Sequence, residues 1–207
     1  MFITLEGPEG SGKSCQIPPL ADFLHQKGYE VLTTREPGGT AIGDQVRQVI
    51  MSMKNTEMSP RTEILLFCSA RAQLVEQVIR PALARGVVVI SDRYADSTLA
   101  YQGYGHRMDL AILRQILDFA TGGLKPDLTL LLDVDVEEGL RRRRCSGGEW
   151  NRLDAYEVEF HKRVRNGYHE LAKAEPHRWK MVDANANREM VQSSIRQVVE
   201  QNLALLD

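Results

Sequence analysis

The sequence is poor in cysteine and has no long apolar run, and each absence excludes a class of protein. Its three cysteines (Cys15, Cys68 and Cys145) lie far apart, with no CxxC or histidine-paired spacing, which indicates neither a disulfide framework nor a zinc site. No uncharged apolar stretch approaches the roughly 20 residues of a membrane span. An apolar run from Phe2 leads straight into a glycine-rich loop, unlike a signal peptide. We therefore expect a cytoplasmic protein with no membrane partner.

An excess of charge of one sign is also missing. The formal net charge is -2, so no global basic field attracts nucleic acid or an anionic membrane, and we expect no nucleic-acid partner. Any polyanionic ligand must be held by local arginines. The 207 residues, 43% of them hydrophobic, suffice for a substantial core. We expect a single domain over residues 1–207.

Short apolar runs alternate along the chain with longer helical patterns. The strand candidates are Phe2–Leu5, Glu30–Thr34, Val87–Ser91, Leu128–Asp133 and Trp179–Val182. The helix candidates are Lys13–Gln26, Ile42–Met53, Glu63–Arg85, Asp109–Thr121, Val136–Arg144, Leu153–Ala174 and Glu189–Leu206. This alternation predicts an α/β fold, with a doubly wound five-stranded parallel sheet flanked by helices. Pro18 and Pro19 fall inside the first helix and predict a kink or a broken turn there.

Residues 7–14 match the phosphate-loop pattern G-x-x-x-x-G-K-[ST] at every fixed position. The loop consists of Gly7, Pro8, Glu9, Gly10, Ser11, Gly12, Lys13 and Ser14. A strand precedes it and a helix follows, so backbone N–H groups and the helix N-terminus converge on phosphate oxygens. Lys13 would reach the β- and γ-phosphates of ATP, and the Ser14 hydroxyl would hold Mg²⁺. The segment therefore predicts a site for ATP with Mg²⁺.

A phosphate loop alone does not name a reaction, because it serves GTPases, motors, transporters and kinases. The N-K-x-D that a GTPase uses to read guanine is not in the sequence. Ser146-Gly147-Gly148-Glu149 is superficially like the S-G-G-Q of transporter ATPases. That signature should precede an apolar strand that ends in aspartate, whereas a polar helix follows here. We interpret it as coincidence.

Charged and aromatic residues stand where a nucleotide kinase needs them. Arg35 ends the second strand candidate, and Asp92 and Arg93 follow the buried third one. The carboxyl edge of an open α/β sheet is where ligands bind, so a guanidinium there suits a phosphate and an aspartate suits Mg²⁺ through water. Phe67 and Arg71 are four residues apart and share a helix face. A ring and a guanidinium together could read a base, although periodicity alone favours Phe67 as a core residue.

Four short motifs in a fixed order resemble the bacterial thymidylate kinases, over Phe2 to Ala184. They are Leu5-Glu6-Gly7, Arg35-Glu36-Pro37-Gly38-Gly39-Thr40, Asp92-Arg93-Tyr94 and Ala100-Tyr101-Gln102-Gly103. The resemblance implies transfer of phosphate from ATP to dTMP, for dTTP synthesis, and a homodimer. The dTMP-binding residues that it implies are Glu9, Arg35, Phe67, Arg71, Arg93, Thr98, Tyr101 and Gln102. In the family, the acidic residue at Glu9 meets the acceptor's sugar hydroxyl, and Tyr101 closes the space of a ribose 2′-hydroxyl.

An arginine-rich segment over about residues 141–153 suggests a lid. Arg141–Arg144 precede a Gly147-Gly148 pair that could act as a hinge, and Arg152 follows; a cationic lid can close over phosphates and exclude water. Ser11 stands where some thymidylate kinases have arginine, and relatives without it supply the cation from the lid. The segment departs from the family's Asp-Arg-x-Glu, because it reads Asn-Arg-Leu-Asp at residues 151–154. That leaves its closing contacts open.

The sequence thus predicts an ATP-dependent dTMP kinase that works by positioning and charge neutralisation. The catalytic residues we expect are Lys13, Asp92, Arg93, Glu9, Arg144 and Arg152. Ser14, and Asp92 through water, would hold Mg²⁺. Two alternatives stay open. One is a kinase for another pyrimidine nucleoside monophosphate, because a thymine methyl is worth only about 1 kcal/mol. The other is a nucleotide-binding regulator without turnover.

Overall fold

The computed structural model describes residues 1–145 and 151–203. Its elements in chain order are β1 Phe2–Glu6, α1 Lys13–Gln26, β2 Val31–Arg35, α2 Ala41–Met51, α3 Pro60–Leu74, the π-helical segment η1 Val75–Ile79, α4 Arg80–Ala84, β3 Val88–Asp92, α5 Ala95–Thr98, the π-helical segment η2 Leu99–Gly105, α6 Leu110–Thr121, β4 Leu128–Asp133, α7 Val136–Cys145, α8 Val158–Ala174, β5 Trp179–Asp183 and α9 Arg188–Leu203. In these described ranges no helix is both long enough and apolar enough to span a bilayer.

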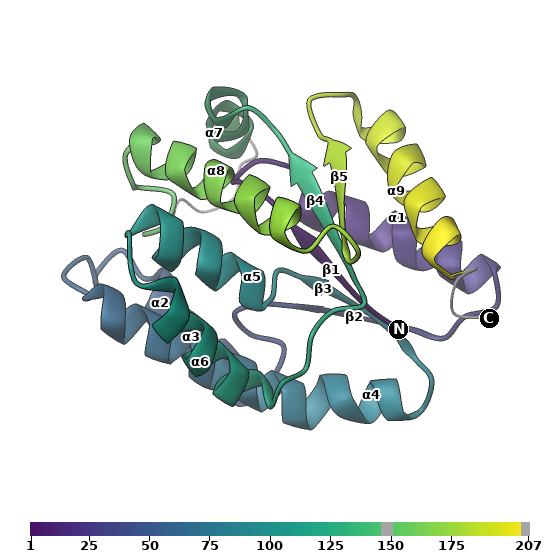
Figure 1. Ribbon diagram of the computed structural model, residues 1–207, viewed down its shortest axis with the longest axis horizontal. Coiled ribbons are helices and arrows are strands. Elements are labelled where there is room, and N and C mark those ends of the chain that lie inside the picture. Colours follow the sequence, from purple (N-terminus) through teal and green to yellow (C-terminus); the bar gives the residue numbers. More distant parts are fainter. Residues whose placement is uncertain (146–150, 204–207) are drawn as a thin grey trace.

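The five strands form one parallel sheet in the order β2-β3-β1-β4-β5. Helices cover both faces, with α1 and α9 side by side on one and α3, α4, α6 and α8 on the other (Figure 1). The central strands β1 and β4 are buried almost throughout, which accounts for their continuous apolar sequence. The doubly wound five-stranded fold is therefore confirmed. All strands point their carboxyl ends toward the same edge, where ligands bind in such sheets.

Side chains of β1 alternate between two cores. Ile3 and Leu5 pack in the core that contains α1 and α9, whereas Phe2 packs against the η1 side. By the same alternation Glu6 points to the face of Phe2 and Thr4, and its side chain is fully buried. A carboxylate thus lies inside the molecule, directly before the phosphate loop.

Two helix starts differ by three residues or more from those expected, and one helical stretch was not expected. The helix expected over residues 63–85 begins at Pro60, capped by Ser59, and contains the π-helical segment η1. Helix α8 begins at Val158 rather than Leu153, because residues 151–156 turn around a buried Arg152. Residues 95–105 are helical, although their glycines indicate no helix.

Helix α1 runs through Pro18 and Pro19 as one element. Pro19 has no N–H for the carbonyl of Cys15, four residues earlier. Arg188 Nη2 donates to that carbonyl at 3.0 Å instead. A side chain from α9 thus replaces a hydrogen bond that the proline removes.

Candidate active site

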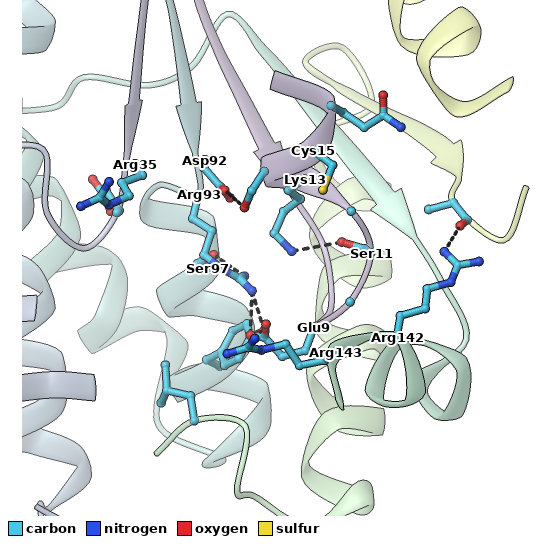
Figure 2. Close-up of a pocket in the computed structure, with 18 of the residues that line it drawn as sticks. Glu9, Ser11, Lys13, Cys15, Arg35, Asp92, Arg93, Ser97, Arg142 and Arg143 are labelled. Carbon is cyan, nitrogen blue, oxygen red and sulfur yellow. Dashed lines mark hydrogen bonds and ion pairs between the residues drawn. The ribbon is translucent and has the colours of Figure 1, made fainter. Parts of the chain in front are cut away.

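A cavity of about 700 Å³ lies at the carboxyl edge of the sheet. The phosphate loop forms its centre, the β2 end, α3 and η2 form one side, and residues 184–191 form the other. Figure 2 shows this arrangement, with Arg35, Asp92 and Arg93 on strand ends and Arg142 and Arg143 on the lid helix α7. The cavity therefore runs along the edge of the sheet where the strands end, from the end of β2 to the residues that follow β5.

The phosphate loop curls around the side chain of Lys13. Its ammonium Nζ donates to the carbonyls of Gly7 and Pro8 at 2.9 Å each and to Ser11 Oγ at 3.0 Å. Gly10 and Gly12 have positive φ values of 71° and 88°, which turn the backbone inward. Burial, reinforced by the nearby Arg93, lowers the pKa of Lys13 to about 8. The ammonium is therefore held at the centre of the loop.

Ser14 and Asp92 meet beside this loop. Ser14 Oγ donates to Asp92 Oδ2 at 2.5 Å, joining the start of α1 to the end of β3. Hydroxyl and carboxylate oxygens are the donors that Mg²⁺ prefers, usually with phosphate oxygens and water completing its shell. Within residues 1–145 and 151–203, no three His, Cys, Asp or Glu side chains cluster as an all-protein metal site. The pair therefore fits a metal that arrives with a nucleotide.

Arg93 lies at the centre of a polar cluster that joins the loop to the acceptor side. Its Nη2 donates to Glu9 Oε1 at 2.8 Å and to Tyr101 OH at 3.0 Å, and Nη1 donates to the Gly7 carbonyl at 3.2 Å. Burial would raise the pKa of Glu9, but Arg93 and Lys13 outweigh it and lower this pKa to about 2. These two cations therefore offset the negative charge of Glu9, which reduces its repulsion of a bound phosphate.

Arg71 is buried on the far side of the cavity. Its Nε donates to Glu36 Oε2 at 2.7 Å, Nη1 to Thr98 Oγ1 at 3.1 Å and Nη2 to the Tyr94 carbonyl at 3.1 Å. Phe67, one turn earlier on α3, is half-buried and lines the cavity, as do Thr98 and Gln102. Phe67 is thus part of the cavity wall, where periodicity alone favoured the core.

Two arginines stand at the mouth of this side. Arg35 Nη2 lies 3.4 Å from Asp44 Oδ1. Arg47 Nη1 donates to the Pro37 carbonyl at 3.0 Å, and burial, with Arg35 nearby, lowers its pKa. Sequence reasoning missed Arg47. Arg47 lies on α2, the first helix after the Arg35–Thr40 turn. That position could have indicated a second cation beside Arg35.

Helix α7 packs directly on the phosphate loop. A Cβ at Gly139 would lie 2.3 Å from the Glu9 carbonyl, and one at Gly10 would lie 1.9 Å from the Gly139 carbonyl. Only glycines permit this approach. Residues three and four positions after Gly139 share its face, so Arg142 and Arg143 line the cavity.

Both lid arginines have fixed contacts. Arg142 Nη1 donates to the Ala184 carbonyl at 2.7 Å, and Arg143 Nη2 donates to Asp154 Oδ2 at 2.8 Å. Asn151 Oδ1 accepts from the Leu153 N–H at 2.8 Å. The two residues that depart from the family pattern thus order the end of the lid.

The two lid arginines expected to be catalytic, Arg144 and Arg152, are not among the described residues that line the cavity. Arg144 is exposed in the last turn of α7. Arg152 is buried and donates to Glu63 Oε2, the Ile50 carbonyl and Tyr156 OH. The expected Gly147-Gly148 hinge lies outside the described residues. The remaining expected site residues line the cavity, except Gly7 and Pro8 at the start of the phosphate loop. Sequence reasoning did not single out Arg142 and Arg143, which also line it.

Comparison with known proteins identifies the family. The family model described as Thymidylate kinase matches residues 5–195. The chain belongs to this family. A thymidylate kinase of Roseiflexus castenholzii is 51% identical, covering 99% of this chain and 94% of the relative. One of Herpetosiphon aurantiacus is 47% identical, covering 100% and 98%.

A solved thymidylate kinase has the same fold. The crystal structure of the Ehrlichia chaffeensis enzyme superposes with a TM-score of 0.80 at 33% identity, covering 96% of this chain and 98% of that one. The family resemblance drawn from four short motifs is therefore confirmed. This chain is an enzyme, a kinase of dTMP in the thymidylate kinase family.

Proposed function

We propose that the chain phosphorylates dTMP to dTDP with ATP and Mg²⁺ through the cavity residues described above. The observation that carries the proposal is Arg93, which contacts both the phosphate loop at Gly7 and the acceptor-side Glu9 and Tyr101. Its guanidinium lies between the donor and acceptor halves of one cavity, where a transferring phosphoryl group must pass.

The donor half is the phosphate loop and the metal pair. The loop backbone over residues 7–14 cradles the ATP phosphates, and Lys13 exchanges its contacts with loop carbonyls for phosphate oxygens. Ser14 would hold Mg²⁺, and Asp92 would hold it through water. The metal supplies charge neutralisation on the phosphates. The ATP base lies toward residues 184–191, which line that end of the cavity.

The acceptor half places dTMP against Phe67. The ring of Phe67 stacks on the base and Arg71 donates to its edge, with Thr98 and Gln102 beside them. Arg35 holds the acceptor phosphate at the cavity mouth. Glu9 receives the sugar hydroxyl. Tyr101, held by Glu9, occupies the space that a ribose 2′-hydroxyl would need.

Transfer requires positioning and charge neutralisation rather than covalent catalysis. Lys13 and Arg93 stabilise the charge on the transferring phosphoryl group from the side of the phosphate loop and the end of β3. A lid arginine stabilises it from the side of α7.

Arg142 and Arg143 both line the cavity. Arg143 is favoured because, after its hydrogen bond to Asp154, the Glu9 carboxylate in the phosphate loop also acts on it electrostatically and helps to raise its pKa. Arg142, by contrast, is held by the Ala184 carbonyl. Arg144 and Arg152 would have to leave the positions described here to reach the phosphates.

The chain is further proposed to act as one domain, residues 1–207, with a lid over about 141–153, and to form a homodimer. Leu65 on α3 and Ile112 and Phe119 on α6 are large apolar side chains that are 56–91% exposed. Helices α3 and α6 pack together, so these apolar side chains stand on neighbouring helices, where a second copy could cover them. Sedimentation velocity of wild type and Phe119→Glu tests this, and a monomeric wild type would refute it.

A steady-state assay of ADP release tests the function. dTMP, dUMP, dCMP, dGMP and AMP are compared as acceptors, each with Mg²⁺ and with EDTA. The proposal expects turnover with dTMP and its loss in EDTA. Preference for dUMP or dCMP would support another pyrimidine kinase. ATP binding without turnover of any acceptor would support the regulator.

A further inference from the structure

Glu63 is a carboxylate on α3 with no exposed surface. It lies four residues before Phe67 and eight before Arg71, so the three share one face of the helix. Glu63 Oε1 accepts from Gln102 Nε2 at 2.6 Å, and Oε2 accepts from Arg152 Nη2. One buried carboxylate thus joins the acceptor-side Gln102 to the end of the lid.

This contact fixes which end of the Gln102 amide faces the cavity. An amide carries donors on its nitrogen and acceptors on its oxygen. A carboxylate paired with a guanidinium accepts hydrogen bonds and donates none. The NH₂ end of Gln102 must therefore face Glu63. The carbonyl end is left for the cavity that Gln102 lines beside Arg71 and Phe67.

Arg71 supplies the opposite kind of group. Glu36 receives the Nε hydrogen and forms an ion pair with Nη2, Tyr94 receives one Nη2 hydrogen, and Thr98 receives one Nη1 hydrogen. The second Nη1 hydrogen has no partner among the described residues. The cavity thus presents one donor and one acceptor next to Phe67, each fixed by a buried carboxylate.

This donor and acceptor match one pyrimidine edge and oppose another. Thymine and uracil carry an acceptor at O4 and a donor at N3–H, which complement Arg71 and the Gln102 carbonyl. Cytosine carries a donor at N4 and an acceptor at N3, so both contacts would be repulsive. A polar site built for one pattern rejects the other strongly, because its buried groups are left unpaired.

We propose that Glu63 is a specificity-determining positioning residue, which makes the acceptor site accept thymine and uracil and reject cytosine by fixing the Gln102 amide. The proposal rests on the proposed function, in which the acceptor base stacks on Phe67. Glu63 acts through Gln102 and does not read the thymine methyl group.

The test compares kcat/KM for dTMP, dUMP and dCMP in wild type, Glu63→Gln, Arg152→Met and the double variant. A glutamine at position 63 can accept or donate, so the Gln102 amide can turn over. The ratio of dTMP to dCMP should fall about tenfold in Glu63→Gln and in the double variant. The ratio of dTMP to dUMP should stay at the wild-type value, because both bases carry O4 and N3–H.

The double variant avoids the loss of stability expected of Glu63→Gln alone. Glu63→Gln alone leaves the Arg152 charge buried and unpaired, which is strongly destabilising, and Arg152→Met removes that charge. Arg152→Met alone keeps a carboxyl group at position 63 that can still accept from Gln102, so its dTMP to dCMP ratio should fall less than that of the double variant. Thermal unfolding of each variant shows whether it is folded.

An unchanged dTMP to dCMP ratio in the folded double variant would overturn the proposal. Equal changes in both ratios would overturn it too, because general loosening of the pocket affects dUMP and dCMP alike. A wild-type enzyme without turnover of dTMP would refute the proposed function itself. The two failures are therefore distinguishable.

Discussion

Arg93 donates through Nη2 to Glu9 Oε1 at 2.8 Å, across 84 residues of sequence. Tyr101 OH donates to the same oxygen at 2.7 Å. Arg93 has a positive φ of 71°, a conformation that costs free energy for a residue with a side chain. The surrounding contacts hold it there. Arg93, expected at the phosphoryl group, is thus hydrogen-bonded directly to Glu9, expected at the acceptor sugar.

Arg93→Ala should lower kcat severely, with a modest rise in the KM for dTMP. Loss of an arginine that stabilises a transferring phosphoryl group costs about 10³-fold or more in kcat. Arg93→Lys should recover little, because one ammonium cannot make the contacts to Gly7, Glu9 and Tyr101 at once. Steady-state kinetics at saturating ATP measure both constants. A large rise in KM with kcat unchanged would mean that Arg93 only binds dTMP.

Glu6 gives the enzyme a distinctive pH dependence of stability. Burial, followed by repulsion from Asp96, raises its pKa from 4.5 to about 7, against the opposing effects of Arg93, Ser97 and Tyr168. The folded state therefore binds a proton more tightly than the unfolded state does. The contribution of Glu6 to stability is full below pH 4.5 and is lost as the pH rises through about 7.

Glu6→Gln should remove this dependence. The free energy of unfolding of the variant minus that of wild type should increase between pH 4.5 and 7.5, by at most about 3 kcal/mol. Urea titrations at several pH values measure it. Glu159→Gln, at an exposed carboxylate of α8, is the control and should give a flat difference. A flat difference for Glu6→Gln as well would contradict the raised pKa.

Phe67→Ala should mainly raise the KM for dTMP, because the stacking surface for the base is lost. Base–aromatic stacking is worth about 1–3 kcal/mol, which corresponds to a rise of about 5- to 150-fold. The KM for ATP should change little, since the phosphate loop lies on the other side of Arg93. A change confined to the KM for ATP would contradict the stacking role. Phe67→Tyr, which keeps a ring, is the matched control.

Residues at strand ends and in the phosphate loop could be placed from the sequence. Their backbone positions follow from the fold, because Asp92 ends β3 and a parallel sheet brings that end beside β1. Arg152 could not be placed in the same way. Its position depends on a buried pairing with Glu63, 89 residues away, and no local pattern encodes such a partner.

The helical stretch 95–105 was missed for a related reason. Gly103 and Gly105 lower helix propensity, so the sequence indicates a loop. In the structure a Cβ at Gly103 would lie 2.4 Å from Leu110, and one at Gly105 would lie 2.6 Å from Phe160. The glycines are there because α6 and α8 pack closely on this segment. Tertiary packing therefore overrides the local propensity.

The lid arginines provide a direct comparison within one helix. Arg143 follows Gly139 by one turn and lines the cavity, whereas Arg144 is exposed and is not among the described residues that line it. Arg143→Gln should therefore lower kcat more than Arg144→Gln, by about tenfold or more, because a cation that neutralises transition-state charge contributes to kcat.

Arg143 also pairs with Asp154, so lost lid order must be separated from lost charge. Asp154→Asn breaks the ion pair and keeps the guanidinium. If Arg143 acts on the phosphoryl group, Asp154→Asn should retain most of the kcat that Arg143→Gln loses. Equal losses in the two variants would mean that Arg143 only orders the lid. A larger loss in Arg144→Gln than in Arg143→Gln would mean that α7 turns on substrate binding, so that Arg144 replaces Arg143 at the phosphates.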